Sequence, residues 1–232
     1  RSYSVTGVQT CALPISEEVI IARDIMLAEA SGAKLHIAHV STSKSLELIK
    51  AAKAKGLPIS CEVTPHHLVL NEEACLSFET NTKMKPPLRS EYDRLACIQA
   101  LKDGLIDCIA TDHAPHADFE KEREFDHAPF GIIGFETAFP VLYRELVLKG
   151  LLDLATLVDC LTCKPARLMN LQGGVIAEGS IADITIIDFK SEFLFSQESV
   201  YSKSKNSPWL NETFPCRIRY TLMGGKITYH DV

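Results

Sequence analysis

Two residues suited to bind a divalent metal stand where short apolar runs of the sequence end. His39 closes one such run and Asp112 closes another. Neutral imidazole nitrogen and carboxylate oxygen are ordinary ligands of zinc, so the two side chains could share an ion. Taken singly, such a histidine is more often a hydrogen-bonded core residue, and such an aspartate is more often a cap. With His113 and His116 beside Asp112, the metal interpretation and the structural one both stay open.

Two further clusters of ligand-type residues carry weaker signals. His66 and His67 are adjacent, and neighbouring residues of a strand point to opposite faces, so both cannot easily reach one ion. Cys160 and Cys163 form the only CxxC pair of the sequence. Because there is no second pair and the context is helical, we interpret them as core cysteines and not as a zinc knuckle or a redox motif.

The segments that must position these residues alternate between helical and strand patterns. Helical patterns, each ending near a glycine, cover residues 17–31, 41–55 and 90–102. Short apolar runs that fit buried strands occupy residues 35–40, 59–63 and 106–111. Strands that alternate with helices of about ten to fifteen residues predict βαβ units and a parallel sheet.

Side-chain alternation along the strands predicts which face each candidate ligand occupies. It puts His39 on the same face as Leu35 and Ile37. It puts Asp112 on the same face as Cys108. In a parallel α/β barrel the C-terminal ends of the strands build the active site, which is where both candidates would lie.

The remainder of the chain predicts two more helices and a β-rich end. The helices are expected over 135–149 and 154–169, and the strands over 181–188, 217–223 and 226–229, with Gly224-Gly225 as a hairpin turn. About three βαβ units are too few for a closed eight-stranded barrel. The predicted fold class is α/β: residues 17–172 form the last strands and helices of a partial TIM (β/α)8 barrel, and residues 173–232 form a small appended β-rich domain.

Residues 1–16 differ from everything after them. They have neither helical nor strand periodicity, and they resemble a translated sequencing-adapter oligonucleotide. We expect this segment to be an assembly artefact and not native protein. The native gene is then expected to extend further upstream, which would make the chain a fragment.

Composition favours small-molecule chemistry. The net charge is -6 and the sequence pI is about 5.8, with no face dense in lysine and arginine, which argues against nucleic acid and anionic membranes as partners. No apolar run approaches the length of a bilayer span, and the N-terminus lacks the order of a secretory signal. The eight cysteines are scattered and mostly flanked by apolar residues, as expected for reduced thiols. A cytoplasmic protein is expected.

Seven motifs together resemble the bacterial dihydroorotases, zinc-dependent cyclic amidohydrolases of pyrimidine synthesis. In order and spacing they are HVST at 39–42, EVTPHH at 62–67, KMKPPLR at 83–89, DCIATDHAPH at 107–116, APFG at 128–131, ETA at 136–138 and ADITIID at 182–188. The resemblance covers residues 17–232. TDHAPH at 111–116 is the most specific motif, because allantoinases and dihydropyrimidinases differ after the Asp-His pair.

The resemblance implies a metal site and its chemistry. One or two Zn²⁺ ions would lie at the mouth of a TIM barrel, with His39 as a later histidine ligand and Asp112 as the final aspartate ligand and general acid/base. Zinc lowers the pKa of bound water and polarises a carbonyl group, while the aspartate transfers the proton. The implied reaction is the reversible cyclisation of N-carbamoyl-L-aspartate to dihydroorotate in the synthesis of UMP.

The resemblance also implies four substrate-binding positions. His116 matches a residue that holds the substrate carboxylate, and Phe130 and Gly131 match a loop whose backbone contacts the pyrimidine ring. Lys85 stands where the family has asparagine. Because lysine only donates hydrogen bonds and adds a charge, ring recognition at that position is in question, and the change is either real or a one-base error.

The family's HxH pair, its bridging carboxylate and its substrate-binding arginine and asparagine would lie upstream of Glu17. A catalytic zinc needs at least three protein ligands, so a fragment with two is expected to bind metal poorly and to be inactive. Two alternatives stay open: a sister cyclic amidase of the allantoinase or dihydropyrimidinase type, and a metal-free subunit that supports a partner. A homodimer and aspartate transcarbamoylase are the protein partners that the resemblance implies.

Overall fold

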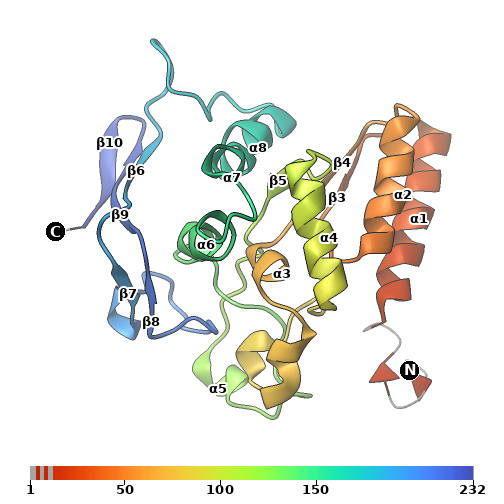
Figure 1. The fold of residues 1–232 in the computed structure, drawn as a ribbon, viewed down its shortest axis with the longest axis horizontal. Helices are drawn as coiled ribbons and strands as arrows, with labels where there is room; N and C mark the ends of the chain where they lie inside the picture. The colour runs from red at the N-terminus through yellow and green to blue at the C-terminus, as the bar shows by residue number, and fades with distance from the viewer. Residues whose placement is uncertain (1–3, 6–7, 10–12, 232) are drawn as a thin grey trace.

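The computed structural model describes residues 4–5, 8–9 and 13–231, so half of the expected non-native segment 1–16 lies outside the described residues. A parallel sheet has the strand order β3-β4-β5 and consists of β3 (Leu35–Ile37), β4 (Ile59–Val63) and β5 (Cys108–Ile109). The helices that connect or precede these strands are α1 (Pro14–Ser31), α2 (Ser43–Ala54) and α4 (Glu91–Lys102). The predicted βαβ arrangement is therefore confirmed (Figure 1).

Local signals define the ends of these helices. The Thr42 hydroxyl accepts a hydrogen bond from the Ser45 amide at the start of α2, and the Ser90 hydroxyl does the same for Asp93 at the start of α4. Gly32 ends α1 in a left-handed conformation, which glycine adopts without strain. Several boundaries differ: α2 and the strands β3 and β5 are shorter than expected, and α1 begins at Pro14, inside the segment expected to be non-native. Proline suits the first turn of a helix, where no intrahelical partner for its nitrogen is needed.

The core lies between the sheet and the helices. In β4 the odd residues Ile59, Cys61 and Val63 are buried, and they share one apolar cluster with Ile49 of α2 and Leu101 of α4. Figure 1 shows α1, α2 and α4 side by side along the sheet. Strand alternation therefore directs the even residues of β4 to the opposite face, away from these helices.

The connection from β4 to α4 is more ordered than the sequence indicates. It contains α3 (Pro65–Val69) and two 3₁₀ helices, Glu72–Ser77 and Thr80–Thr82. The treatment of His66 and His67 as strand residues is therefore wrong, because both lie in α3, where Pro65 occupies the first turn and Thr64 caps the helix. After β5 the chain forms a long loop that contains α5 (Asp118–Lys121).

The two predicted later helices are each divided. The first comprises α6 (Ala138–Leu142) and a π-helical turn, Tyr143–Val147, and the second comprises α7 (Leu154–Leu161) and α8 (Cys163–Leu168). The break at Thr162 follows from Pro165, whose ring would clash with the Leu161 carbonyl in a continuous helix. Cys160 is buried in the core as predicted, whereas the Cys163 thiol is partly exposed and donates to the Gly174 carbonyl. Every described cysteine is free.

The C-terminal region is β-rich, as predicted. An antiparallel sheet has the order β10-β9-β6 and contains β6 (Ile184–Asp188), β9 (Arg217–Met223) and β10 (Lys226–His230). Gly224 and Gly225 both have positive φ, as a two-residue hairpin turn requires. The sequence did not predict the separate pair β7 (Phe193–Phe195) and β8 (Glu212–Phe214) or the 3₁₀ turn Gln197–Ser199.

A second apolar cluster attaches this region to the loops near the sheet. It includes Phe195, Trp209 and Phe214 from the β-rich region and Met84 and Ile132 from the loops. Near the N-terminus, β1 (Ser4–Val5) pairs with β2 (Val8–Gln9). Among the described residues, no helix has both the length and the apolar character needed to cross a bilayer.

Candidate functional site

His39 and Asp112 both lie just beyond the C-terminal ends of their strands, in left-handed backbone conformations. Their φ angles are 55° and 49°, which few residues other than glycine adopt. The predicted face of His39 is wrong: Ile37 packs in the helical core, whereas the His39 side chain lies beside Glu62 on the opposite face. The positive φ breaks the alternation that the prediction assumed. Such conformations cost free energy and concentrate at functional sites.

The structure brings the two predicted metal ligands together. His39 Nε2 lies 3.5 Å from Asp112 Oδ1, and His39 Nδ1 lies 2.9 Å from Glu62 Oε1. The other Glu62 oxygen accepts from His36 Nε2 at 3.2 Å, and His36 Nδ1 contacts the Ser60 hydroxyl at 2.8 Å. A continuous row of polar contacts therefore runs from the sheet to the site.

These contacts shift three pKa values. The contact with Glu62 raises the pKa of His39, although burial acts in the opposite direction. Burial would raise the pKa of Glu62, but His39 and His36 outweigh it and the pKa is lowered. Burial raises the pKa of Asp112, partly offset by His39. A carboxyl group that is easier to protonate is suited to proton transfer.

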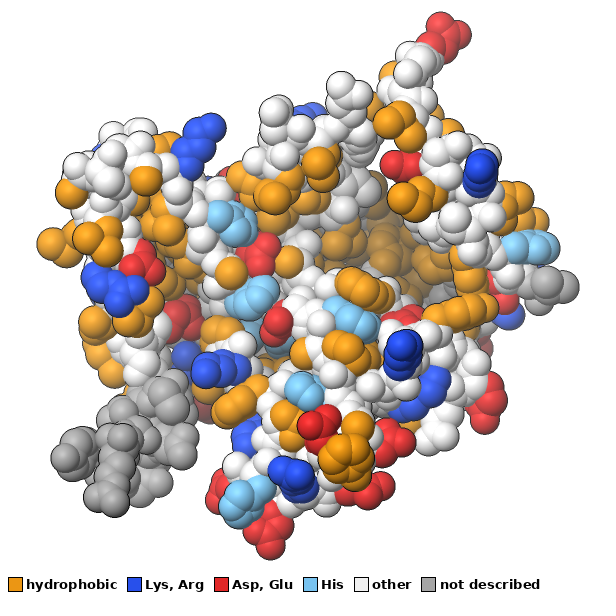
Figure 2. All heavy atoms as spheres, turned by 180° about the vertical axis from the view of Figure 1, so that it is seen from behind, with side chains coloured by type: hydrophobic (Ala, Val, Ile, Leu, Met, Phe, Trp, Pro, Cys, Tyr) orange, Lys and Arg blue, Asp and Glu red, His pale blue; other side chains and the backbone are white. Residues whose placement is uncertain are grey.

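The spacing of His39 and Asp112 fits ligation of one divalent ion. Two donors bonded to a tetrahedral zinc at ordinary bond lengths lie about 3.3 to 3.5 Å apart, and the observed separation is 3.5 Å. His36, Glu62 and Cys108 form a second group of ligand atoms, within 4.8 Å of one another. Burial raises the pKa of Cys108 to about 12, which keeps the thiol protonated and makes it a poor ligand. Figure 2 shows histidine and acidic side chains gathered near the middle of one face, beside a hollow lined with hydrophobic side chains.

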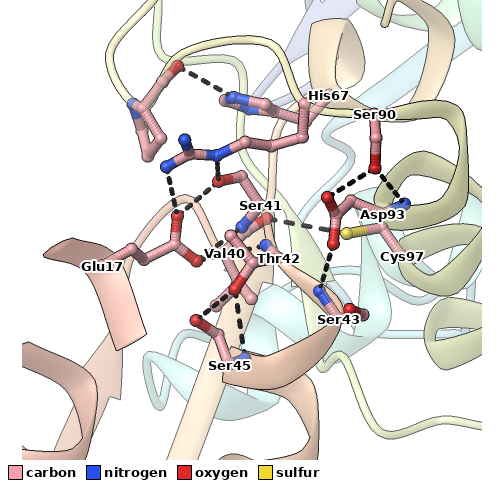
Figure 3. Close-up of polar contacts among 12 residues, drawn as sticks. Glu17, Val40, Ser41, Thr42, Ser43, Ser45, His67, Ser90, Asp93 and Cys97 are labelled. Carbon is pink, nitrogen blue, oxygen red and sulfur yellow. Dashed lines mark hydrogen bonds and ion pairs between the residues drawn. The ribbon is translucent and has the colours of Figure 1, made fainter. Parts of the chain in front are cut away.

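The turn that follows His39 is anchored by a buried carboxylate (Figure 3). Glu17 accepts hydrogen bonds from the backbone amides of Ser41 and Thr42 at 3.0 and 3.2 Å and from the Ser41 hydroxyl. Arg89 lies 3.5 Å from the same carboxylate, and both side chains are largely buried. This network joins α1, the His39 turn and the loop before α4, so it restricts the backbone that carries His39.

The structure places the four predicted substrate-binding residues around one loop. His116 Nε2 contacts the Phe130 carbonyl at 2.9 Å, and Lys85 Nζ lies 5.7 Å from the centre of the Phe130 ring. Gly131 has a φ of 101°, and a Cβ there would lie 2.6 Å from Ala114 Cβ. Glycine is therefore required for the Phe130 loop to approach the loop that carries Asp112 and His116.

Asn206 is a residue of this site that the sequence did not indicate. Its side-chain nitrogen donates to the carbonyls of Ala114 and Gly131 at 2.9 and 3.3 Å, and its side-chain oxygen accepts from the His116 amide at 3.2 Å. The side chain is buried and comes from the β-rich region, 90 residues beyond His116. No local pattern marks it, because its role depends on contacts that only the folded chain creates.

Of the other candidate histidines, His113 and His67 have hydrogen-bond partners, whereas His66 Nε2 is buried without one among the described residues. His113 accepts a hydrogen bond from the Gly134 amide at 3.0 Å and stacks on Phe135, at the edge of a cavity of about 540 Å³. His67 contacts the Thr64 hydroxyl at 2.7 Å and the Pro86 carbonyl at 3.0 Å. His66 is buried in the same short helix, and burial lowers its pKa well below the usual value.

Comparisons with known proteins agree on one family. The model of the amidohydrolase family matches residues 8–228. A dihydroorotase from Endomicrobium trichonymphae is 52% identical over 215 residues, which is 92% of this chain and 51% of that protein. A dihydroorotase from Elusimicrobium minutum is 51% identical over 212 residues, which is 91% of this chain and 49% of that protein. The chain thus spans about half the length of the curated relatives it matches.

Solved structures with the same fold belong to related hydrolases. An L-hydantoinase (dihydropyrimidinase) from Arthrobacter aurescens superposes with a TM-score of 0.87 and 29% identity, covering 93% of this chain and 49% of that one. A dihydropyrimidinase from Brevibacillus agri superposes with a TM-score of 0.86 and 27% identity, covering 94% and 49%. Sequence identity is therefore much higher to the dihydroorotases than to these hydantoinases.

Proposed function

This chain belongs to the amidohydrolase family, and we propose that the whole protein is a dihydroorotase, which interconverts N-carbamoyl-L-aspartate and dihydroorotate in pyrimidine synthesis. The similarity to curated dihydroorotases, at 52% and 51% identity over nine-tenths of the chain, carries this proposal. The contact between His39 and Asp112 supports it, because the reaction needs a polarised carbonyl and a proton carrier at one point.

We propose Zn²⁺ as the metal and His39 and Asp112 as two of its ligands. Their 3.5 Å separation and their nitrogen and oxygen donors fit zinc. When bound, the ion would lower the pKa of a water molecule and polarise the ring carbonyl. Since catalytic zinc has at least three protein ligands, the other ligands, and a second ion if there is one, belong to the part of the relatives that this chain does not span.

Asp112 is proposed as the general acid and base. In the hydrolytic direction the ring amide C–N bond breaks and the oxygen of water bonds to the carbonyl carbon. The Asp112 carboxylate takes one proton from that water and delivers it to the departing nitrogen. The reverse sequence closes the ring with loss of water. The raised pKa of Asp112 supports this role, because it brings the group closer to the pH at which it must hold a proton transiently.

His116, Phe130, Gly131 and Lys85 are proposed to bind the substrate. The His116 imidazole is suited to donate to a carboxylate, and the loop backbone at Phe130 and Gly131 is suited to read the imide edge of the ring. Phe130 is 44% exposed, which leaves its ring accessible to a ligand. Lys85 is exposed and can contribute only donors and a positive charge.

Turnover on the whole protein tests this function. We expect hydrolysis of dihydroorotate to exceed that of dihydrouracil and allantoin by at least about a hundredfold, because a site that hydrogen-bonds a substrate group rejects analogues that lack it. The alternative function is that of a hydantoinase-like cyclic amidase, which is supported by the similarity of the fold to solved hydantoinases and dihydropyrimidinases. Such an enzyme would hydrolyse dihydrouracil or allantoin faster than dihydroorotate. A protein that contains zinc but hydrolyses none of the three substrates would refute both candidate functions. A protein without zinc and without turnover would be a non-catalytic subunit.

Further proposals concern the whole molecule. Residues 17–172 are proposed to form the C-terminal part of a TIM barrel, with residues 173–232 as an appended β-rich domain. The three parallel strands with their covering helices, and the separate antiparallel sheets, support this division. A cytoplasmic location, a homodimer and an association with aspartate transcarbamoylase rest on the similarity to dihydroorotases alone. Size-exclusion chromatography with and without the transcarbamoylase tests both assemblies.

A further inference from the structure

Lys121, the last residue of α5, is a buried cation that the proposed reaction does not use. Its side chain donates to three main-chain oxygens: those of Thr80 at 2.8 Å, Pro129 at 3.0 Å and Gly131 at 3.1 Å. An ammonium group has three N–H donors and no acceptor, so three converging carbonyls match it. The residue is 7% exposed, and burial lowers its pKa to about 8.

The three carbonyls belong to two segments that are far apart in the sequence. Pro129 and Gly131 flank Phe130 in what we call the substrate loop, residues 126–131. Thr80 belongs to a 3₁₀ turn before the Lys85 segment, and its hydroxyl donates back to the Lys121 carbonyl at 2.6 Å. The Lys121 ammonium group therefore joins the substrate loop to that turn across α5.

Carbonyl directions in the substrate loop alternate around this group. The oxygens of Pro129 and Gly131 face Lys121 Nζ, whereas the oxygen of Phe130 between them faces His116 Nε2 at 2.9 Å. The Phe130–Gly131 peptide therefore lies between two peptides whose carbonyl oxygens are bound by Lys121. With both flanking peptides held, and with its own oxygen in contact with His116, the Phe130 carbonyl is restrained in direction.

A second lysine holds the other half of the loop from the exposed side. Lys83 Nζ donates to the carbonyls of Asp126 and Ala128 at 3.0 and 2.8 Å and lies 4.7 Å from the centre of the Phe130 ring. The Lys83 carbonyl accepts from the Gly131 amide at 2.8 Å. Four of the loop's six carbonyls are thus bound by two ammonium groups, at Asp126, Ala128, Pro129 and Gly131.

We propose that Lys121 is a positioning residue for the substrate loop, which holds the Pro129 and Gly131 carbonyls so that Phe130 and His116 keep the geometry that binds substrate. Burying a cation costs free energy unless hydrogen bonds compensate for the lost hydration. An apolar side chain would fill this space without that cost, so the lysine indicates that its hydrogen bonds to the carbonyls have a role. This inference rests on the proposed function for the identity of the substrate, but the ordering of the loop does not depend on it.

The test replaces Lys121 in the whole protein. Lys121→Met keeps a side chain of similar length without donors. Lys55→Met is the matched control, because the Lys55 side chain makes an exposed ion pair with Glu29 and no other ion pair with the described residues. In Lys121→Met we expect amide hydrogen exchange in residues 126–131 to rise about tenfold or more, with exchange in α2 and α4 unchanged. The KM for dihydroorotate should rise about tenfold, with kcat altered by less than about threefold, because the loop contributes binding more than chemistry.

Several results would overturn this inference. One is a folded Lys121→Met protein whose loop exchange and KM equal those of Lys55→Met. Another is a lower unfolding temperature with unchanged KM, which would mean that Lys121 only stabilises the fold. If Lys121→Met does not fold, Lys121→Gln replaces it in the test, because the glutamine amide offers two N–H donors for three carbonyls. A raised KM in Lys121→Gln would support the proposal, and an unchanged KM would refute it. If the unmodified protein does not turn over dihydroorotate, the proposed function fails, and loop exchange alone then decides the role of Lys121.

Discussion

Acidification from pH 7 to pH 5 should destabilise the protein, because His67 is buried as a neutral imidazole. The residue is 3% exposed, and its Nε2 must donate to the Pro86 carbonyl, which can only accept. Its Nδ1 is then the acceptor for the Thr64 hydroxyl. A second proton would remove that acceptor and place a charge in the core. Burial accordingly lowers the pKa of His67 to about 4.

The size of the effect follows from proton linkage. An unfolded histidine has a pKa of about 6.5, so between pH 6.5 and pH 4 the unfolded chain binds a proton that the native state does not. Stability is therefore lost as the pH falls through this window. For His67 alone the loss is about 2 kcal/mol at pH 5 and about 3 kcal/mol near pH 4. His66 acts in the same direction, because burial also lowers its pKa.

Urea unfolding at pH 7 and pH 5, followed by circular dichroism, measures this loss. The His67→Gln variant keeps an amide donor and acceptor but cannot be protonated, so its loss between the two pH values should be smaller than that of the unmodified protein by about 2 kcal/mol. His127→Gln, at an exposed histidine, should leave the loss unchanged. Equal losses in the unmodified protein and in His67→Gln would refute the reasoning.

Three further predictions concern the site. Asp112→Asn should lower kcat by at least about a thousandfold, because it changes the side chain proposed both as a metal ligand and as the proton carrier. Steady-state kinetics with metal analysis measures this, and retained activity would contradict the proposed role. Glu62→Gln should weaken zinc binding about 10- to 100-fold, measured by competition with a chelator, because the carboxylate lies beside Nδ1 of His39, the proposed ligand, and would orient its ring. Unchanged affinity would contradict this. Gly131→Ala should lower the free energy of unfolding by about 1 to 3 kcal/mol, through its positive φ and the clash with Ala114, whereas Gly173→Ala, in open space, should be near neutral.

The β-rich region reaches the candidate site through one side chain, that of Asn206. Asn206 joins the Ala114–His116 backbone to Gly131, and its neighbours Trp209 and Phe214 belong to the cluster that packs against the loops. The region therefore contributes hydrogen bonds to the candidate site in addition to its own sheets. It fixes the distance between the loop that carries Asp112 and the substrate loop.

Local sequence signals determined much of the scaffold. Thr42 and Ser90 cap their helices, Gly32 ends α1, and Gly224-Gly225 makes the hairpin turn, because each of these features needs only a few neighbouring residues. The strand β4 was equally readable as a short apolar run over 59–63. The seven motifs, of which 111–116 is the most specific, identified the family, since they are linear patterns.

Tertiary structure alone decided how the site is assembled. His39 and Asp112 were predicted as ligands, but their shared face depends on two positive φ angles that no local pattern specifies and that the surrounding contacts must hold. Glu62 and Asn206 could be recognised as residues of the site only in the folded structure. They contact His39 and His116, which lie 23 and 90 residues away in the sequence, respectively. The physical reason is that residue types fix which chemistry is available, whereas distances between side chains from separate segments exist only once the core has packed.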